Sequence, residues 1–444
     1  MDEQQTTLYP LGEHPLRGDL SDEIRARPYE IMVSPLRGSY IASLSGENGG
    51  SSERAHVAGL CSIFNVSPPQ DTDNYFSTTL KTDKGEIRFR WERHTEFSTY
   101  FFHMTAKPDD DNPFENPVIR LLPVDWLTSI PGKILVATHL ALEKPKTPER
   151  GIDEISKLFG GNTIAGSFMS RGRAKVWTDF RFHADGFGRH LICDMNLDGR
   201  SAGRMIQRLL EINTYRMFAM LALPEARSAR PAISDAEQRL SVIVQKFSAT
   251  GSIQDERELL KELSELAAKM ENISANLSYR MGSTRAYYEL VKRRVADIHE
   301  ERIPGIQPPA EFVNRRLIPA MDTCFSVENR LSQVSERIIR ATDLLRTRVD
   351  VTLEEQNRDL LSSMNRRAQM QIRLQQTVEG LSVVAISYYL TGLVVYAAKG
   401  IKAAGVHIDS DLAGGVAFPI ILVAVWLSIR NIRRAIIKTD DMDV

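Results

Sequence analysis

Three side chains within one short stretch have the types that bind metals or transfer protons. Glu92, His94 and Glu96 alternate in residues 90–98, RWERHTEFS. Alternate side chains of a strand project to the same face, so these three would stand together. Two carboxylates and an imidazole could hold a divalent cation or pair a general base with an acid. The competing interpretation is a polar solvent face with cross-strand ion pairs, because no second cluster with metal-ligand spacing accompanies it.

Other polar stretches have simpler explanations. Residues 194–199, DMNLDG, begin like a calcium loop, but Met205 stands at position 12, where such loops need a bidentate glutamate. We therefore interpret them as a turn with a helix cap. The acidic run Asp109, Asp110 and Asp111 is typical of a solvated loop. Gly160-Gly161-Asn162 is not a phosphate-binding loop, and the GxSxG and HExxH motifs of hydrolases are missing.

One helical segment carries arginines that would face an anion. They are Arg204, Arg208 and Arg216, accompanied by Glu211 and Tyr215. An ordinary amphipathic surface explains the same pattern. Nothing in these stretches argues strongly for an enzyme.

Composition narrows the function classes. The chain has 444 residues, with 56 lysines plus arginines against 57 aspartates plus glutamates. This balance excludes a nucleic-acid binder that works by bulk charge. Cys61, Cys193 and Cys324 are too few and too far apart for a disulfide framework or a tetrahedral zinc site.

Residues 1–225 hold β-like runs at 86–103, 133–142 and two within 164–195, together with a helix at 202–223 that Pro224 ends. They predict a cytoplasmic α+β or α/β domain.

Two charge-free stretches near the carboxyl end predict membrane spans. Residues 380–398 and 412–429 each approach the roughly 20 residues that cross a bilayer, although a buried hairpin would share this composition. Basic residues precede the first span and follow the second, in a tail at 430–444 that is basic and then acidic. Both ends are therefore expected in the cytoplasm, with a short loop outside and membrane lipid as a partner. The polar beginning of the chain lacks a secretory signal.

Residues 226–379 between the domain and the spans predict a long helical stalk. Apolar side chains recur at spacings of four and three, as in an antiparallel coiled coil, at Leu259, Leu263, Leu266, Met270, Ile273 and Leu277, and again at Val327, Leu331, Val334, Ile338, Ala341 and Leu345. Prolines and a glycine at 304–309 break the pattern, and the second helix is expected to restart after Pro319. A helix this long needs partners, which predicts a homo-oligomer.

Several stretches resemble one bacterial family. They are residues 14–17 (HPLR), 25–28 (RARP), 93–100 (RHTEFSTY), 207–211 (QRLLE) and 214–216 (TYR), together with the terminal hydrophobic pair. The chain is similar along nearly its whole length to the uncharacterised membrane-anchored proteins called domain of unknown function 3422. This resemblance implies a membrane protein and supplies no activity or functional residues.

The order of parts also resembles the CorA magnesium channels. These channels place a cytoplasmic α/β domain, a long helix, two spans and a basic tail in this order, with a Gly-Met-Asn signature after the first span. Here residues 396–400 read YAAKG, so the methionine and asparagine have no counterpart.

The sequence therefore leaves two main hypotheses open. The first is an oligomeric scaffold or sensor anchored in the cytoplasmic membrane, neither an enzyme nor a nucleic-acid binder. The alternative is a CorA-like divalent cation channel, with Ser382, Ser387, Tyr388 and Thr391 lining the pore and Asp409 and Asp411 attracting cations at its outer mouth. An enzyme built on Glu92, His94 and Glu96 is a third possibility, and a divalent cation is the only cofactor that these residues suggest.

Overall fold

The structure is a computed structural model. It describes residues 14, 16–17, 29–70, 74–107, 111–249, 253–403 and 409–440. The chain forms two compact units: one contains residues 1–249 and 261–341, and the other contains residues 250–260 and 342–444. These units divide the predicted stalk between them.

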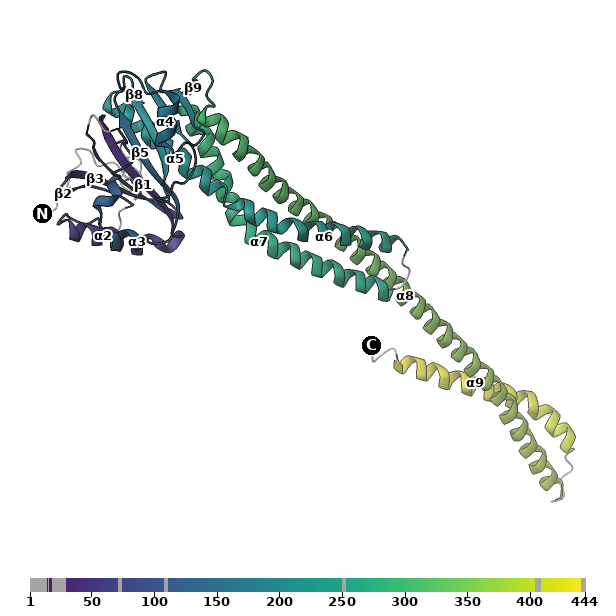
Figure 1. Cartoon of the computed structure of the whole chain (residues 1–444). Helices are drawn as coiled ribbons and strands as arrows, with labels where there is room; N and C mark the ends of the chain where they lie inside the picture. The colour runs from purple at the N-terminus through teal and green to yellow at the C-terminus, as the bar shows by residue number, and fades with distance from the viewer. Residues whose placement is uncertain are drawn as a thin grey trace. The chain divides into compact units, whose positions relative to one another are not determined.

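The first unit is built on one mixed sheet (Figure 1). Among the described residues, nine strands form it in the order β2-β3-β4-β1-β5-β8-β7-β6-β9. The strands are β1 (Leu36–Leu44), β2 (Tyr75–Thr82), β3 (Gly85–Arg93), β4 (Phe97–Thr105), β5 (Lys133–Glu143), β6 (Ala165–Met169), β7 (Ala174–Thr178), β8 (Gly188–Asp194) and β9 (Glu301–Arg302). Neighbours are antiparallel except β5 and β8. The predicted α+β domain is confirmed.

The strand predictions hold with two refinements. Residues 86–103 form the paired strands β3 and β4, with Trp91 opposite Tyr100. Residues 164–195 contain three strands where two were expected. The third is β6, whose close approach to β7 depends on Gly166, because a Cβ atom there would lie 2.2 Å from the Trp177 ring.

Short helices cover one face of the sheet. They are α2 (Gly50–Ile63), α3 (Val124–Thr128) and α4 (Ile152–Leu158), with 3-10 turns η1 (Glu47–Gly49) and η2 (Val118–Leu121). Side chains of alternating strand positions, including Phe89, Trp91 and Phe102, pack against Leu60 of α2 and Trp126 of α3. This aromatic packing forms the main core of the unit.

Helix α5 (Gly199–Ala219) covers the opposite face. Its Thr214 hydroxyl lies 2.9 Å from the hydroxyl of Tyr40 on β1. Asp198 caps its amino end by accepting a hydrogen bond from the backbone N–H of Ser201, so the predicted turn and helix cap are confirmed. The prediction that Pro224 ends this helix was wrong. Pro224 lies in the first turn of α6 (Ala222–Ala249), where a missing N–H breaks no helical hydrogen bond.

An extended segment, residues 29–33, crosses α5. The backbone N–H of Met32 donates to the Gly199 carbonyl. A Cβ atom at Gly203 would lie 1.8 Å from the backbone oxygen of Glu30. Only glycine at 203 therefore lets the segment lie against the helix and bring the Glu30 side chain to the sheet.

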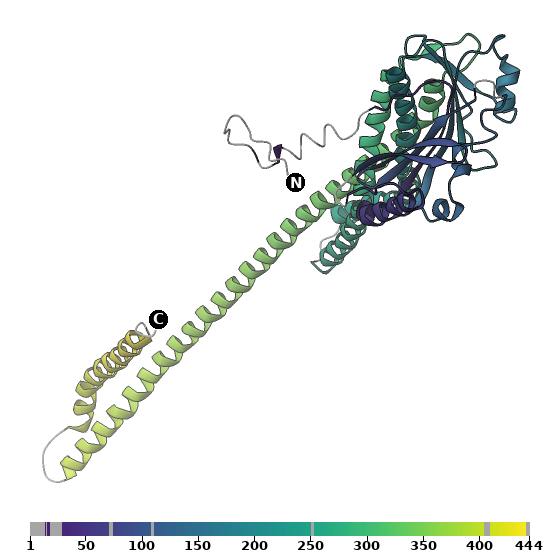
Figure 2. The same ribbon diagram turned by 90° about the vertical axis from the view of Figure 1, so that its left-hand side faces the viewer.

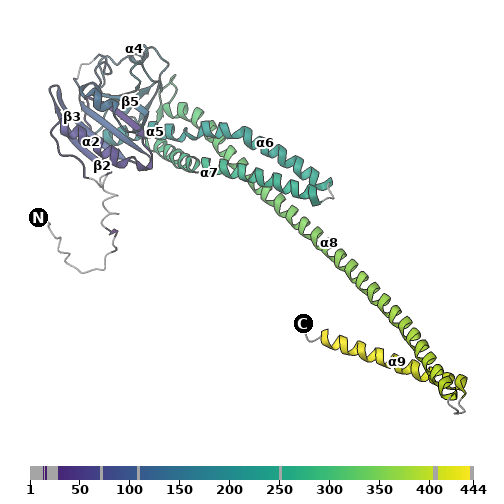
Figure 3. The same cartoon turned by 90° about the horizontal axis from the view of Figure 1, so that it is seen from below.

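Three long helices pack together in the first unit, as Figure 3 shows. Besides α6 they are α7 (Ile253–Asp297) and α8 (Pro309–Ala403). Ion pairs join Lys269 to Asp235, Arg285 to Glu328 and Arg330 to Glu237. Apolar residues of the predicted pattern, Leu263, Leu266, Met270, Leu277, Val327, Leu331, Val334 and Ile338, are buried.

Helix α8 does not restart after Pro319, contrary to the prediction. It begins at Pro309 and continues through Pro319. Val313 and Leu317 before the proline and Met321 after it are buried. This packing on both sides offsets the hydrogen bond that proline cannot make.

The second unit contains residues 253–260 of α7, residues 342–403 of α8, and α9 (Ser410–Asp440). Arg348 pairs with Glu256 across a distance of 2.9 Å. Near their ends α8 and α9 approach closely (Figure 2), because a Cβ atom at Gly414 would lie 2.7 Å from Val395. Both helices contain a window long and apolar enough to cross a membrane.

Candidate functional site

The structure divides the predicted Glu92, His94 and Glu96 cluster. Strand β3 ends at Arg93, so His94 and Glu96 lie in the turn before β4, where side chains no longer alternate. The Glu96 carboxylate turns to α7, where it accepts hydrogen bonds from Arg280 at 3.0 Å and Tyr287 at 2.9 Å. Within the part of the chain that the structure describes, no three His, Cys, Asp or Glu side chains are arranged to hold a metal.

Glu92 and His94 instead line a cavity of about 20 Å³ between the sheet and α5. We call it the Glu92 cavity. Its lining is Tyr40, Arg90, Glu92, His94, Phe97, Thr99, Gln207, Leu210, Glu211, Thr214 and Tyr215. Strands β1, β3 and β4 supply one wall and α5 the other. Two sequence stretches more than a hundred residues apart, 93–100 and 207–216, thus meet around one polar space.

Charged side chains form a chain of contacts along this cavity. Arg90 Nε lies 3.2 Å from Glu92 Oε1, and Arg90 Nη1 lies 3.8 Å from Glu30 Oε2. The Gln207 amide donates to Glu211 at 2.9 Å. Glu211 in turn pairs closely with Arg294 of α7. The cavity is therefore linked to the crossing segment on one side and to α7 on the other.

Glu30 is the most strongly perturbed carboxyl group of this network. Burial by itself raises the pKa of Glu30, but the His103 hydrogen bond and the Arg90 guanidinium outweigh burial and lower this pKa to about 2. Arg88 Nε also donates to it, at 2.9 Å. The Ser77 hydroxyl donates a further hydrogen bond to Glu30 at 3.0 Å. Glu30 is thus held as a carboxylate.

Replacing Glu30 with glutamine should destabilise the protein at pH 7 by about 3 kcal/mol, the equivalent of a pKa lowered from 4.5 to about 2. A lowered carboxyl pKa contributes stability that is fully present above pH 4.5 and is lost as the pH falls toward 2. The difference between wild type and Glu30→Gln should shrink over that window. Denaturant unfolding followed by tryptophan fluorescence would measure it, and a constant difference would contradict the assignment.

Stacked rings connect the cavity wall to α7. The His94 ring stacks on Phe97 with centroids 4.3 Å apart. Phe97 in turn contacts Phe218 at 4.3 Å and Tyr287 at 6.1 Å. Tyr215 stacks on Tyr287 at 5.8 Å. A change in the cavity would therefore reach α7 through directly packed side chains.

Much of the stretch 93–100 holds the fold together. Arg93 pairs at 3.0 Å with Glu53 of α2, which is fully buried. Ser98 donates a further hydrogen bond to Glu53 at 2.7 Å. Only His94, Phe97 and Thr99 of this stretch line the cavity.

The three arginines of α5 do not converge on one anion. Arg204 donates to the Ser201 hydroxyl, and Arg208 Nε lies 3.7 Å from Asp297. Arg216 donates to Asn213 and lies over the Phe180 ring, 4.8 Å from its centroid. The arginines therefore make separate structural contacts.

Comparison with protein families identifies one family model that matches most of the chain. The family model described as protein of unknown function (DUF3422) matches residues 12–436. The chain belongs to this family. The match includes the sheet, helices α6, α7 and α8, and most of α9. No curated protein matches the chain. The CorA resemblance has no support in these comparisons.

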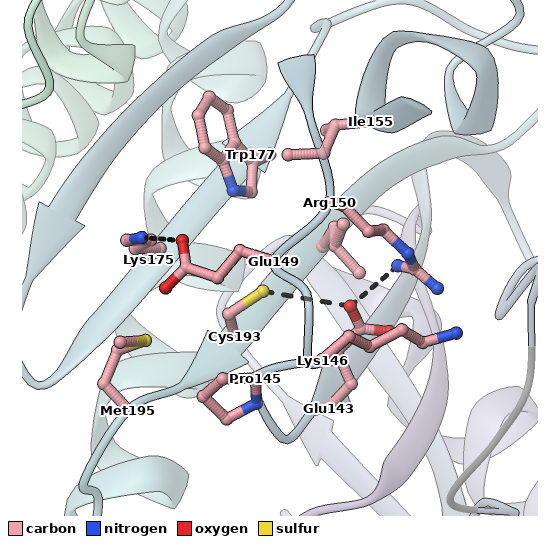
Figure 4. A pocket seen from close by; sticks show the side chains of 11 residues that line it. Glu143, Pro145, Lys146, Glu149, Arg150, Ile155, Lys175, Trp177, Cys193 and Met195 are labelled. Atoms are coloured by element: carbon pink, nitrogen blue, oxygen red, sulfur yellow. Dashed lines mark hydrogen bonds and ion pairs between the residues drawn. The ribbon is translucent and has the colours of Figure 1, made fainter. Parts of the chain in front are cut away.

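A second cavity of this DUF3422 protein lies beside α4 and has a volume of about 40 Å³ (Figure 4). Lys175 pairs with Glu149 at 2.6 Å, and Arg150 pairs with Glu143 at 2.7 Å. The Cys193 thiol lies between these two ion pairs. Burial and the charge of Glu143 raise the pKa of Cys193 to about 12, so the thiol stays protonated and is a poor nucleophile. The sequence carried no sign of this cavity, because its residues are spread over 143–195.

The predicted pore residues of this family member all lie in α8. Ser382 and Thr391 donate to backbone carbonyls in the preceding turn, at 2.8 and 2.7 Å. Ser387 is fully buried, whereas Tyr388 is 72 % exposed. Asp411 is exposed at the start of α9, beside Asp409.

The acidic run falls partly outside the described residues. Asp109 and Asp110 are not among them. Asp111 is exposed and lies 3.4 Å from Lys146.

Proposed function

We propose that this protein is an oligomeric scaffold or sensor anchored in the cytoplasmic membrane. The observation that carries the proposal is the apolar outer surface of α8 and α9. Large apolar side chains are exposed there: Leu381, Val384, Tyr389, Leu393, Tyr396, Leu412, Val416, Ile420 and Val423. Leaving such surface in water costs about 25 cal/mol per Å², and lipid would remove that cost.

Residues 380–398 and 412–429 are the proposed spans. The basic residues on their outer flanks favour cytoplasmic ends and a short external loop. Close packing of α9 on α8 at Gly414 supports a two-helix transmembrane hairpin, because small residues let membrane helices approach.

Self-association through a coiled coil is the second part of the proposal. Within the second unit, the described residues 354–378 of α8 are exposed on almost every side. They include the apolar side chains of Leu360, Met364 and Leu374. A helix gains most of its stability by packing an apolar stripe, so a second copy of the chain is the expected partner.

The sheet and α5 would supply the sensing part. The Glu92 cavity is polar and is connected to α7 through the Glu211–Arg294 ion pair and through the ring contacts from His94 to Phe97 and from Phe97 to Tyr287. Packed side chains and ion pairs of this kind can carry energetic coupling between sites. A ligand in the cavity would thus alter α7.

Membrane attachment can be tested by alkaline carbonate extraction. Wild-type protein should stay with the membranes. The double variant Leu393→Arg, Val423→Arg should be released from the membranes or destabilised, since each arginine near the centre of a span costs roughly 3 kcal/mol on insertion. Val351→Arg, at an exposed position of α8 outside the spans, is the matched control and should behave as wild type. Release of the wild type by carbonate would contradict the proposal.

A further inference from the structure

One carboxylate oxygen of the Glu92 cavity lacks a hydrogen bond. The Glu92 residue is 6 % exposed, and its Oε1 takes no hydrogen bond although Arg90 Nε lies 3.2 Å away. The other oxygen lies 3.8 Å from His94 Nε2. A buried polar atom without a hydrogen bond costs free energy, so a donor in the cavity would stabilise this arrangement.

The buried charges around the cavity are mainly negative. The Glu30, Glu92 and Glu211 side chains are 9, 8 and 18 % exposed. Arg90, at 5 %, is the one comparably buried arginine or lysine of this network among the described residues, and the His103 imidazole, at 10 %, contacts Glu30. Arg88 and Arg294 are 43 and 29 % exposed, so water screens their charges more strongly. A positively charged donor is therefore favoured over a neutral or anionic one.

The size and walls of the cavity restrict that donor further. A volume of about 20 Å³ holds only one or two water-sized groups. Tyr40, Thr99 and Thr214, which carry hydroxyl groups, and the aromatic residue Tyr215 are among the residues that line it. Cations bind over aromatic faces, and an ammonium group offers several N–H donors in the volume of a water molecule.

We propose that the Glu92 cavity binds an ammonium group, either the free ammonium ion or the protonated amino group of a small primary amine. The carboxylate of Glu92 accepts one N–H, and the neighbouring hydroxyls accept others. This inference rests on the proposed sensing function, because it names the ligand of the same cavity. It replaces the divalent cation that the sequence suggested.

The test uses the full-length protein in detergent and follows thermal unfolding by tryptophan fluorescence. Trp91 and Trp177 lie in the sheet and Trp126 packs on it. Ammonium and methylammonium chloride should raise the unfolding temperature above that in potassium chloride of equal ionic strength. Tetramethylammonium, which has no N–H donor, should not. Equal effects of ammonium and potassium would overturn the inference, because they would show that the cavity does not recognise an N–H donor.

Substitution assigns the effect to the cavity. Glu92→Gln should weaken the apparent affinity for ammonium at least tenfold, because the charge is lost and the shape is kept. Glu289→Gln removes an exposed carboxylate that pairs with Lys292, and it should bind as wild type. Unchanged affinity in Glu92→Gln would overturn the assignment. If Glu92→Gln does not fold, the comparison of cations on the wild type still decides.

Hydrogen exchange separates the ligand from the sensing function. Ammonium should slow exchange in residues 279–294 of α7 if the cavity is coupled to that helix. Binding without any change in α7 would support the ligand and contradict the sensor. Absence of binding would remove the ligand while leaving membrane attachment, measured by carbonate extraction, untouched.

Discussion

Lowering the pH from 6.5 to 4 should remove about 3 kcal/mol of stability for each of two buried histidines, His139 and His190. Burial lowers the pKa of His139 to about 4, with Asp185 opposing and Arg189 assisting the shift. Burial and the charge of Arg216 lower the pKa of His190 to about 4. The unfolded chain binds these protons near pH 6.5 and the folded protein does not. The stability is therefore complete above pH 6.5 and is lost progressively as the pH falls to 4.

Denaturant unfolding at several pH values would measure this loss. Burial also lowers the pKa of His56 to about 4. His190→Gln should therefore remove about a third of the histidine-dependent loss in that window, since one of three protons no longer binds on unfolding. His299→Gln changes an exposed side chain and is the matched control. A stability that stays constant between pH 6.5 and 4 would show that these imidazoles are not held neutral by burial.

Replacing Glu53 with alanine should destabilise the protein by about 4 kcal/mol, because it leaves the Arg93 guanidinium buried without its carboxylate. Glu53 is fully buried, and it accepts hydrogen bonds from Arg93 at 3.0 Å and Ser98 at 2.7 Å. Ser45 also donates to it. Equilibrium unfolding in denaturant gives the difference in free energy.

A double-mutant cycle tests the cause of that loss. Glu53→Ala with Arg93→Met should cost less than the sum of the two single changes, since neither charge is then left alone. Glu336→Ala breaks the exposed pair with Arg340 and should cost less than about 1 kcal/mol. Strict additivity in the buried pair would show that Arg93 does not depend on Glu53.

The cycle also bears on how the stretch RHTEFSTY is understood. Arg93 and Ser98 contact the buried Glu53 through an ion pair and a hydrogen bond, and Glu96 accepts hydrogen bonds from Arg280 and Tyr287. A dense titratable stretch therefore does not by itself mark a catalytic site, because three of its eight residues hold the β3–β4 turn against α2 and α7. His94 remains on the cavity wall.

The sequence alone determined the features that depend on local periodicity. Alternation over residues 86–103 predicted paired strands, and the charge-free runs at 380–398 and 412–429 predicted two apolar helices, which α8 and α9 contain. The spacing of leucines around Leu263 and Leu331 predicted buried helix faces. Each signal comes from the geometry of a single strand or helix, so neighbouring residues are enough to carry it.

Only the tertiary structure decided which polar groups meet. Glu92 and Glu96 are four residues apart, yet β3 ends between them. Glu92 therefore lines the cavity beside α5, whereas Glu96 contacts α7. Glu92 and Glu211 are distant in sequence, yet both line one cavity. Pro319 stays within α8 because burial of Leu317 and Met321 outweighs its local preference. Long-range packing sets these outcomes, and its free energy exceeds the propensities that a local pattern reports.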